Sequence, residues 1–111
     1  MNDPIQLVYV TTPDRETATS LATLAVEEGR AACGNVGGPI TSVFRWEGAV
    51  QTGEEWTLLL KTSAAQLEAL TELLSEAHPY TVPCIVAVAS SGGLPAFHDW
   101  VRSACATGGS S

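Results

Sequence analysis

The fold of this chain is decided by residues 40–62, ITSVFRWEGAVQTGEEWTLLLKT. Their side chains alternate between two faces with the two-residue period of β-strands, as expected for the two arms of a hairpin. One face of the first arm carries Ile40, Ser42, Phe44 and Trp46, and the residues between them face the other way. The second arm alternates in the same way, with leucines on both of its faces. Because apolar side chains occupy both faces, the pattern predicts a long hairpin whose uncovered side needs a partner.

The turn of this hairpin is predicted from its glycines. Gly48 ends the first arm, and Thr52-Gly53 precedes the second, which then runs over residues 54–62. Glycine adopts the backbone angles that turns require. We therefore expect the tip of the hairpin to lie between residues 48 and 53.

A strand, a helix and a further strand are predicted before this turn. Residues 5–10 form a short apolar run, which is typical of a strand buried on both faces. Thr12-Pro13-Asp14 then predicts a helix start with a capping hydroxyl, and Gly29 predicts the end of that helix. Residues 31–47 return to strand character, interrupted at Gly37-Gly38-Pro39.

A helix, a strand and a terminal helix are predicted after the hairpin. Residues 63–66, SAAQ, match a capping box, in which Gln follows Ser by three residues. The second helix has an apolar stripe at helical spacing, made of Leu67, Leu70, Leu73, Leu74 and Ala77. Residues 84–89 follow as a strand. The last helix, from Leu94 to about Ala104, is expected to bury Phe97, Trp100 and Val101 and to leave Cys105 as a surface thiol.

The order of these elements defines a fold class. Strand, helix, strand, strand, helix and strand, with a helix added at the end, predict an α+β fold of the split β-α-β, ferredoxin-like kind. Both crossover helices should cover one face of a four-stranded antiparallel sheet. We predict a single domain over residues 1–106 and a flexible tail over residues 107–111, which is small and polar.

Composition narrows the possible functions. Only 15% of the 111 residues are charged and 45% are hydrophobic, so one face is expected to be buried against other copies of the chain. The formal net charge of -7 opposes binding to nucleic acid or to an anionic membrane surface. No transmembrane stretch or signal peptide is visible, and three cysteines without a Cys-x-x-Cys pair favour a reducing cytoplasm.

Residues 77–85, AHPYTVPCI, join the second predicted helix to the last strand. Pro79 and Pro83 bias the residues before them away from helical conformation, so His78 and Tyr80 should lie in a stiff, extended loop. An imidazole and a phenol held in this way favour a specific role. The alternative is structural, because a His suits the negative end of a helix dipole and a Tyr often covers the edge of a core.

The candidate metal ligands are Cys33, His78 and Cys84. Thiolate and imidazole prefer copper or zinc to magnesium or calcium, although packing in the core is the alternative for each cysteine alone. Lys61 is the only lysine, and it lies in an apolar strand. It either extends to the surface or pairs with an acid such as Glu55 at a subunit boundary.

Catalytic chemistry is not favoured by this sequence. It has no nucleophile elbow and no phosphate-binding loop, and its paired carboxylates at Glu27-Glu28 and Glu54-Glu55 are interpreted as solvated. We therefore expect no enzymatic activity and no required cofactor, with copper as the possible bound ion.

A set of short motifs occurs in order from about Val8 to Val101. They are Ala31-Ala32-Cys33-x-Asn35, Trp46-Glu47-Gly48, Glu55, Leu60-Lys61-Thr62, His78-Pro79-Tyr80-x-x-Pro83 and Asp99-Trp100. In order and spacing this set resembles the CutA divalent-cation tolerance proteins. The resemblance implies a ferredoxin-like subunit, a tight homotrimer built through the long hairpin, and a cytoplasmic role in tolerance to copper or other divalent metals.

The resemblance also assigns residues. The family usually has Glu after Pro83, where this chain has Cys84. Copper positions proposed for some members fall here on Val10 and Ala77, so Cys33 alone carries over. The family is further similar to trimeric nitrogen-regulatory signalling proteins, which bind small ligands in clefts between subunits.

Two functional interpretations follow. In the first, a homotrimer binds divalent metal, preferably copper, through Cys33 or through His78 with Cys84. In the second, a signalling-like or scaffolding trimer binds a small molecule or protein in an inter-subunit cleft. The residues expected in that cleft are Trp46, Glu55, Lys61 and Tyr80.

Overall fold

The computed structural model describes residues 3–107, with side chains described as far as Cys105. Its elements are β1 (Ile5–Thr12), α1 (Arg15–Glu27), β2 (Cys33–Trp46), β3 (Ala49–Ser63), α2 (Ala64–Ala77), β4 (Ile85–Ala89) and α3 (Pro95–Thr107). The predicted tail at residues 108–111 lies outside the described residues, and residue 107 lies in α3. Within the described part of the chain, no helix is long and apolar enough to cross a bilayer.

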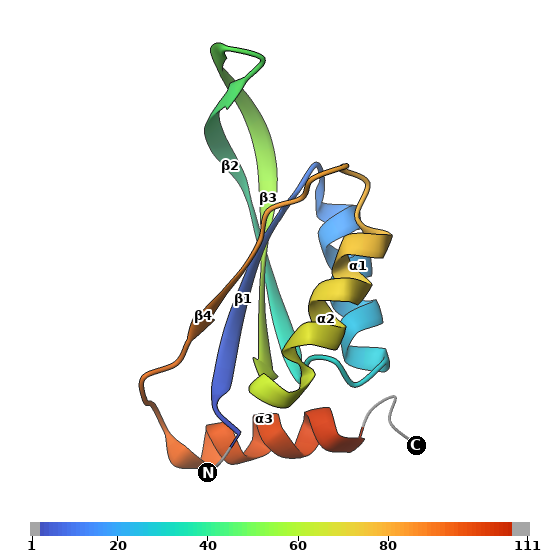
Figure 1. Cartoon of the computed structure of the whole chain (residues 1–111), viewed down its shortest axis with the longest axis vertical. Helices are drawn as coiled ribbons and strands as arrows, with labels where there is room; N and C mark the ends of the chain where they lie inside the picture. The colour runs from blue at the N-terminus through green and yellow to red at the C-terminus, as the bar shows by residue number, and fades with distance from the viewer. Residues whose placement is uncertain (1–2, 108–111) are drawn as a thin grey trace.

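The four strands form one antiparallel sheet in the order β2-β3-β1-β4. Helices α1 and α2 lie on one side of this sheet, and α3 runs across its lower end (Figure 1). The β2–β3 hairpin extends beyond the rest of the molecule along its longest axis (Figure 1), and the molecule with its hairpin measures 45 × 28 × 21 Å. The predicted α+β, ferredoxin-like arrangement with a long hairpin is confirmed.

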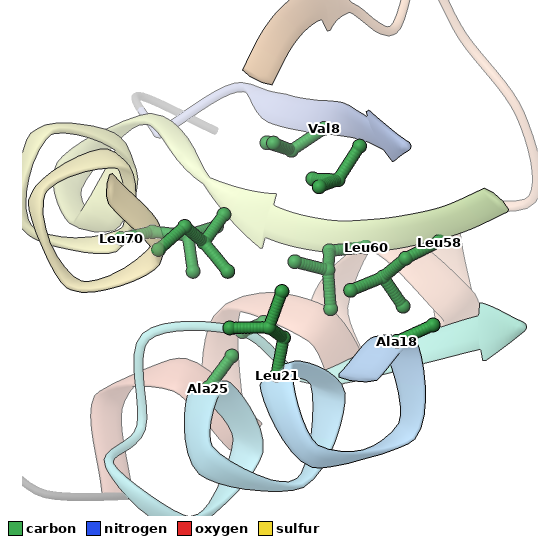
Figure 2. Packing of buried hydrophobic residues seen from close by; sticks show 10 residues of the cluster. Val8, Ala18, Leu21, Ala25, Leu58, Leu60 and Leu70 are labelled. Carbon is green, nitrogen blue, oxygen red and sulfur yellow. The ribbon is translucent and has the colours of Figure 1, made fainter. Parts of the chain in front are cut away.

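The core lies between the sheet and the two helices. Alternate residues of β1 and β3 point toward α1 and α2, because side chains on a strand change face at every residue. Figure 2 shows Val8, Leu58 and Leu60 meeting the helices in this layer. The helices contribute Ala18, Leu21, Ala25, Leu70 and Leu74, all of which are buried. The predicted stripe of α2 is therefore confirmed for Leu70 and Leu74, but Ala77 is exposed.

The opposite face of the sheet is apolar and uncovered in the single chain. We call it the open sheet face and define it by Tyr9, Phe44, Trp46, Val86 and Val88, whose exposed fractions are 37%, 43%, 58%, 51% and 55%. The prediction that the first strand is buried on both faces is wrong for this chain alone, because none of the three described helices covers this side (Figure 1). Exposed apolar patches of this kind mark interaction surfaces.

A β-bulge in β2 determines which hairpin residues join the open sheet face. Gly37 pairs with Thr57, but Ile40 pairs with Glu55, so β2 has one extra residue at this point. Gly38 has φ +143°, and a Cβ there would come within 2.7 Å of the Trp56 ring. Because the extra residue reverses the alternation, Phe44 and Trp46 lie on the same face as Glu55.

The predicted start of each crossover helix needs a correction. Asp14, and not Thr12, caps α1, since its side chain accepts a hydrogen bond of 2.7 Å from the Thr17 N–H. Ser63 makes no side-chain cap, so the capping box is wrong. Asp3 instead accepts the Ala65 N–H at 2.8 Å, and Gln66 accepts a hydrogen bond from Arg30.

The hairpin turn and the last helix also differ from expectation. The turn is only Glu47-Gly48, both at positive φ, so β3 begins at Ala49 and not at residue 54. In α3, Val101 is buried as predicted, but Phe97 and Trp100 are 40% and 48% exposed. Cys105 is 1% exposed, so the expectation of a surface thiol is wrong. Helix α3 packs against the end of the sheet through Val101 and Cys105.

Candidate functional site

His78 holds the loop between α2 and β4 in place through hydrogen bonds of its backbone and its ring. Its backbone ends α2 in an extended conformation, as Pro79 requires, and its N–H still bonds the Leu74 carbonyl at 2.9 Å. The ring is buried, with an exposed fraction of 7%. His78 Nε2 lies 2.8 Å from the Thr11 carbonyl oxygen, and the Tyr80 N–H donates to His78 Nδ1 at 3.1 Å.

These two partners determine the tautomer of His78. A carbonyl oxygen only accepts and a backbone N–H only donates, so the proton of the neutral ring is on Nε2. Both ring nitrogens are therefore engaged within the chain. A metal ion could bind His78 only after one of these hydrogen bonds had broken.

Tyr80 and Glu55 form a hydrogen-bonded pair between the loop and the hairpin. Tyr80 Oη donates to Glu55 Oε2 at 3.0 Å, and Ser42 Oγ donates to Glu55 Oε1 at 2.7 Å. Burial, followed by the hydrogen bond and the charge of Glu55, raises the pKa of Tyr80 to about 12. The phenol is therefore neutral at physiological pH and holds the carboxylate in place from one side while Ser42 holds it from the other.

A pocket opens beside this carboxylate, between the outer half of the hairpin and the loop. It has a volume of about 930 Å³ and is walled by aromatic, aliphatic and small polar side chains. The lining residues are Thr11, Ser42, Val43, Phe44, Trp46, Glu55, Pro79, Tyr80, Thr81, Val82 and Cys84. Three of the four residues predicted for a cleft, namely Trp46, Glu55 and Tyr80, meet here, together with Cys84.

Lys61, the fourth residue predicted for the cleft, lies outside this pocket. It is four residues further along β3 than Thr57, toward α3, and its Nζ donates a hydrogen bond to Asn35 Oδ1. Lys61 is not among the residues that line the pocket.

Cys33 shares the surroundings of Lys61, since the two residues pair across β2 and β3. Burial, with a smaller contribution from Cys105, raises the pKa of the Cys33 thiol, and the positive charge of Lys61 opposes this increase. The thiol is therefore mostly protonated at neutral pH, which disfavours metal binding unless an ion or a partner residue stabilises the thiolate.

The structure does not bring the three candidate metal ligands together within one chain. Cys33 pairs with Lys61, whereas His78 bonds Thr11, which is opposite Thr57. Four residues along a strand span about 13 Å, so Cys33 and His78 cannot share one ion. Among residues 3–107, no three His, Cys, Asp or Glu side chains are grouped as a metal site.

Ser42, Phe44 and Thr11 are pocket residues that were not identified as site residues from the sequence. The alternation of residues 40–46 already placed Ser42 and Phe44 on the face of Trp46. The sequence did not show where the bulge lies. The bulge places Ser42, Phe44 and Trp46 on the same face of the sheet as Glu55. No local signal marks Thr11, which reaches the pocket only through the pairing of β1 with β3.

Fold and site together define a class: ferredoxin-like subunits with a projecting hairpin and a polar-centred pocket beside an open sheet face. The family model described as CutA1 divalent ion tolerance protein matches residues 6–104. The chain therefore belongs to the CutA1 divalent ion tolerance family, as its motifs predicted.

Individual relatives agree with this assignment. The chain is 40% identical over 97 residues to the divalent-cation tolerance protein CutA of Thermus thermophilus, covering 87% of this chain and 94% of that protein. It is 41% identical over 100 residues to the chloroplastic protein CutA of Arabidopsis thaliana, covering 90% of this chain. The chain spans about half the length of the plant relatives, 55% for the Arabidopsis protein and 56% for a chloroplastic CutA of Oryza sativa.

Solved structures show the same fold. The divalent cation tolerance protein of Thermus thermophilus superposes with a TM-score of 0.87 at 39% identity, covering 89% of this chain and 96% of that one. The divalent ion tolerance protein CutA1 of Ehrlichia chaffeensis gives a TM-score of 0.89 at 30% identity, covering 95% and 98%.

Proposed function

We propose that this protein acts in divalent-cation tolerance as a homotrimer that binds metal, preferably copper, without catalytic turnover and without a resident cofactor. The observation that supports it best is the open sheet face of a chain that belongs to the divalent ion tolerance family. Five exposed apolar residues on one side of a small sheet need a cover, and identical subunits are the simplest cover. Three free cysteines fit a reducing compartment, and we place the protein in the cytoplasm.

The proposed metal ligands are Cys33 and Cys84, each acting with residues of a neighbouring subunit. Cys84 is exposed and lines the pocket, and Cys33 is partly exposed beside Lys61. Both are soft ligands suited to copper. His78 is a weaker candidate than its sequence context suggested, because Thr11 and Tyr80 engage both ring nitrogens.

Calorimetric titration tests this proposal. Cu(II), and Cu(I) under a reductant, would be titrated into the wild-type protein and into Cys33→Ser, Cys84→Ser and His78→Ala, with Cys105→Ala as the control for a buried thiol. We expect Cys33→Ser or Cys84→Ser to weaken binding at least about tenfold, and binding to weaken in acid because thiolates must lose protons. Unchanged affinity in both cysteine variants would contradict the metal proposal.

A second function is favoured by the hydrogen bonds that organise the pocket. Glu55 is held by Ser42 and Tyr80 before any ligand binds, and the aromatic side chains of Phe44, Trp46 and Tyr80 line the same pocket. Pockets with apolar walls and a few fixed polar groups are typical small-molecule sites. The second candidate is therefore a trimer that binds a small molecule between its subunits, at Trp46, Glu55 and Tyr80.

A further inference from the structure

The pocket beside Glu55 contains one charged group, the Glu55 carboxylate, and its walls are mostly apolar. Among the described lining residues, Glu55 is the only Asp or Glu, and none is Lys or Arg. The two hydrogen bonds that Glu55 accepts leave one lone-pair site on each oxygen, since a carboxylate accepts about four. The carboxylate can therefore accept hydrogen bonds from a ligand without losing Ser42 or Tyr80.

The walls of the pocket are suited to a particular kind of cation. Phe44 and Trp46 lie two residues apart on one face of β2, and both are about half exposed. The faces of aromatic rings attract organic cations, and the attraction is strongest for Trp. Tyr80 adds a third ring, and it remains an uncharged phenol that donates to Glu55.

A bare metal ion is not held by this pocket within one chain. Divalent ions need several oxygen, nitrogen or sulfur ligands at one point, and the strongest candidate ligands in the pocket are one carboxylate and the Cys84 thiol. A metal ion at Cys84 would therefore need further ligands from a neighbouring subunit. An anionic ligand would meet Glu55 with no compensating positive charge in the described lining. The net charge of -7 acts in the same direction, because it attracts cations toward the molecule.

We propose that this pocket binds a small organic cation, a guanidinium, amidinium or alkylammonium ion, with Glu55 as its counter-ion and with Phe44 and Trp46 against its apolar part. The proposal specifies the ligand class for the second function above and rests on that function. It does not depend on the metal proposal. Phe44 and Trp46 belong to the open sheet face, so in the trimer a neighbouring subunit would form the outer wall of the pocket and the cation would lie between the two subunits.

The test compares benzamidinium with benzamide, which has nearly the same shape but no charge. Each would be titrated into the full chain by calorimetry in the presence of EDTA, so that failure of the metal proposal cannot affect the result. We expect benzamidinium to bind at least about tenfold more tightly than benzamide. Equal affinity of the two probes, or no binding of benzamidinium at millimolar concentration, would overturn the proposal.

Variants assign the binding to the pocket. Glu55→Gln should weaken benzamidinium at least about tenfold and leave benzamide unchanged. Glu54→Gln is the matched control, because it removes the same charge from the neighbouring residue outside the lining. Trp46→Leu provides a second, independent variant and should weaken both probes. If Glu54→Gln and Glu55→Gln weaken benzamidinium equally, the binding reflects net charge and the proposal is wrong.

Discussion

Tyr80 shows how one residue can report on the candidate site. Its pKa is raised to about 12, first by burial and then by the hydrogen bond and charge of Glu55. We predict that Glu55→Gln lowers this pKa but leaves it above the ordinary value of 10.0, because the effect of burial remains. Absorbance titration of the phenolate measures the shift, with Glu54→Gln as the control. No change in the Glu55→Gln protein would show that the two side chains are not bonded in solution.

The same pKa predicts how stability depends on pH. The folded protein holds the Tyr80 proton more tightly than the unfolded chain, whose pKa is near 10.0. The contribution of Tyr80 to folding is therefore complete below pH 10.0 and is lost as pH rises through about 12. Denaturant unfolding across this range, compared with Tyr80→Phe, should show a steeper loss of stability in the wild-type protein. Parallel curves would contradict the raised pKa.

Cys33 provides a second prediction at the scale of single residues. Burial raises its pKa, and the charge of Lys61 partly opposes this effect. Lys61→Gln should therefore raise the pKa further, leave less thiolate at a given pH and slow alkylation of Cys33 by iodoacetamide. Peptide mapping by mass spectrometry would follow the reaction site by site, with Arg45→Gln at the hairpin tip as the control. Faster alkylation of Cys33 in Lys61→Gln would contradict the assigned electrostatics.

At the scale of elements, α3 is held by its buried face and not by its aromatic residues. Val101 has an exposed fraction of 0% and Trp100 one of 48%. We predict that Val101→Ala lowers the free energy of unfolding by about 2 kcal/mol, from the lost apolar burial and the cavity left behind. Trp100→Ala should lower the stability by less. Thermal unfolding of the two variants and the wild type at the same protein concentration measures the difference. A larger effect of Trp100→Ala would mean that a partner covers this side of α3.

The sequence predicted elements well where one pattern dominated. The alternation of residues 40–46 identified the face that carries Phe44 and Trp46, and the spacing of Leu70 and Leu74 identified the buried side of α2. Both patterns depend only on the period of a strand or a helix. The helix caps were harder, because the Ala65 N–H is bonded by Asp3, which is distant in sequence.

The site was only partly predictable, because its residues are also brought together from distant parts of the sequence. Trp46, Glu55 and Tyr80 come from separate segments, and their meeting depends on the bulge between Gly37 and Ile40. Two glycines and a proline signalled an interruption there, but they did not show that its effect is to reverse the alternation. Cys105 was assigned to the surface because α3 was expected to end near it, whereas the helix continues to Thr107.

At the scale of the whole molecule, the open sheet face should direct assembly. Val86 lies on this face, pairs with Tyr9 and is 51% exposed. Val86→Lys places a charge on a surface that we propose to be buried between subunits, which should shift the protein toward monomer. Thr71→Lys, on the exposed side of α2, is the matched control and should leave assembly unchanged. Identical assembly in both variants would place the interface elsewhere.

The most direct test of the central claim is the molar mass of the intact protein in solution. Light scattering coupled to size-exclusion chromatography at micromolar concentration should give three times the chain mass of 11.6 kDa. That result would support a homotrimer that covers the apolar residues left exposed in the single chain. A mass equal to one chain would contradict the account, because the open sheet face would then be exposed to solvent in the working protein.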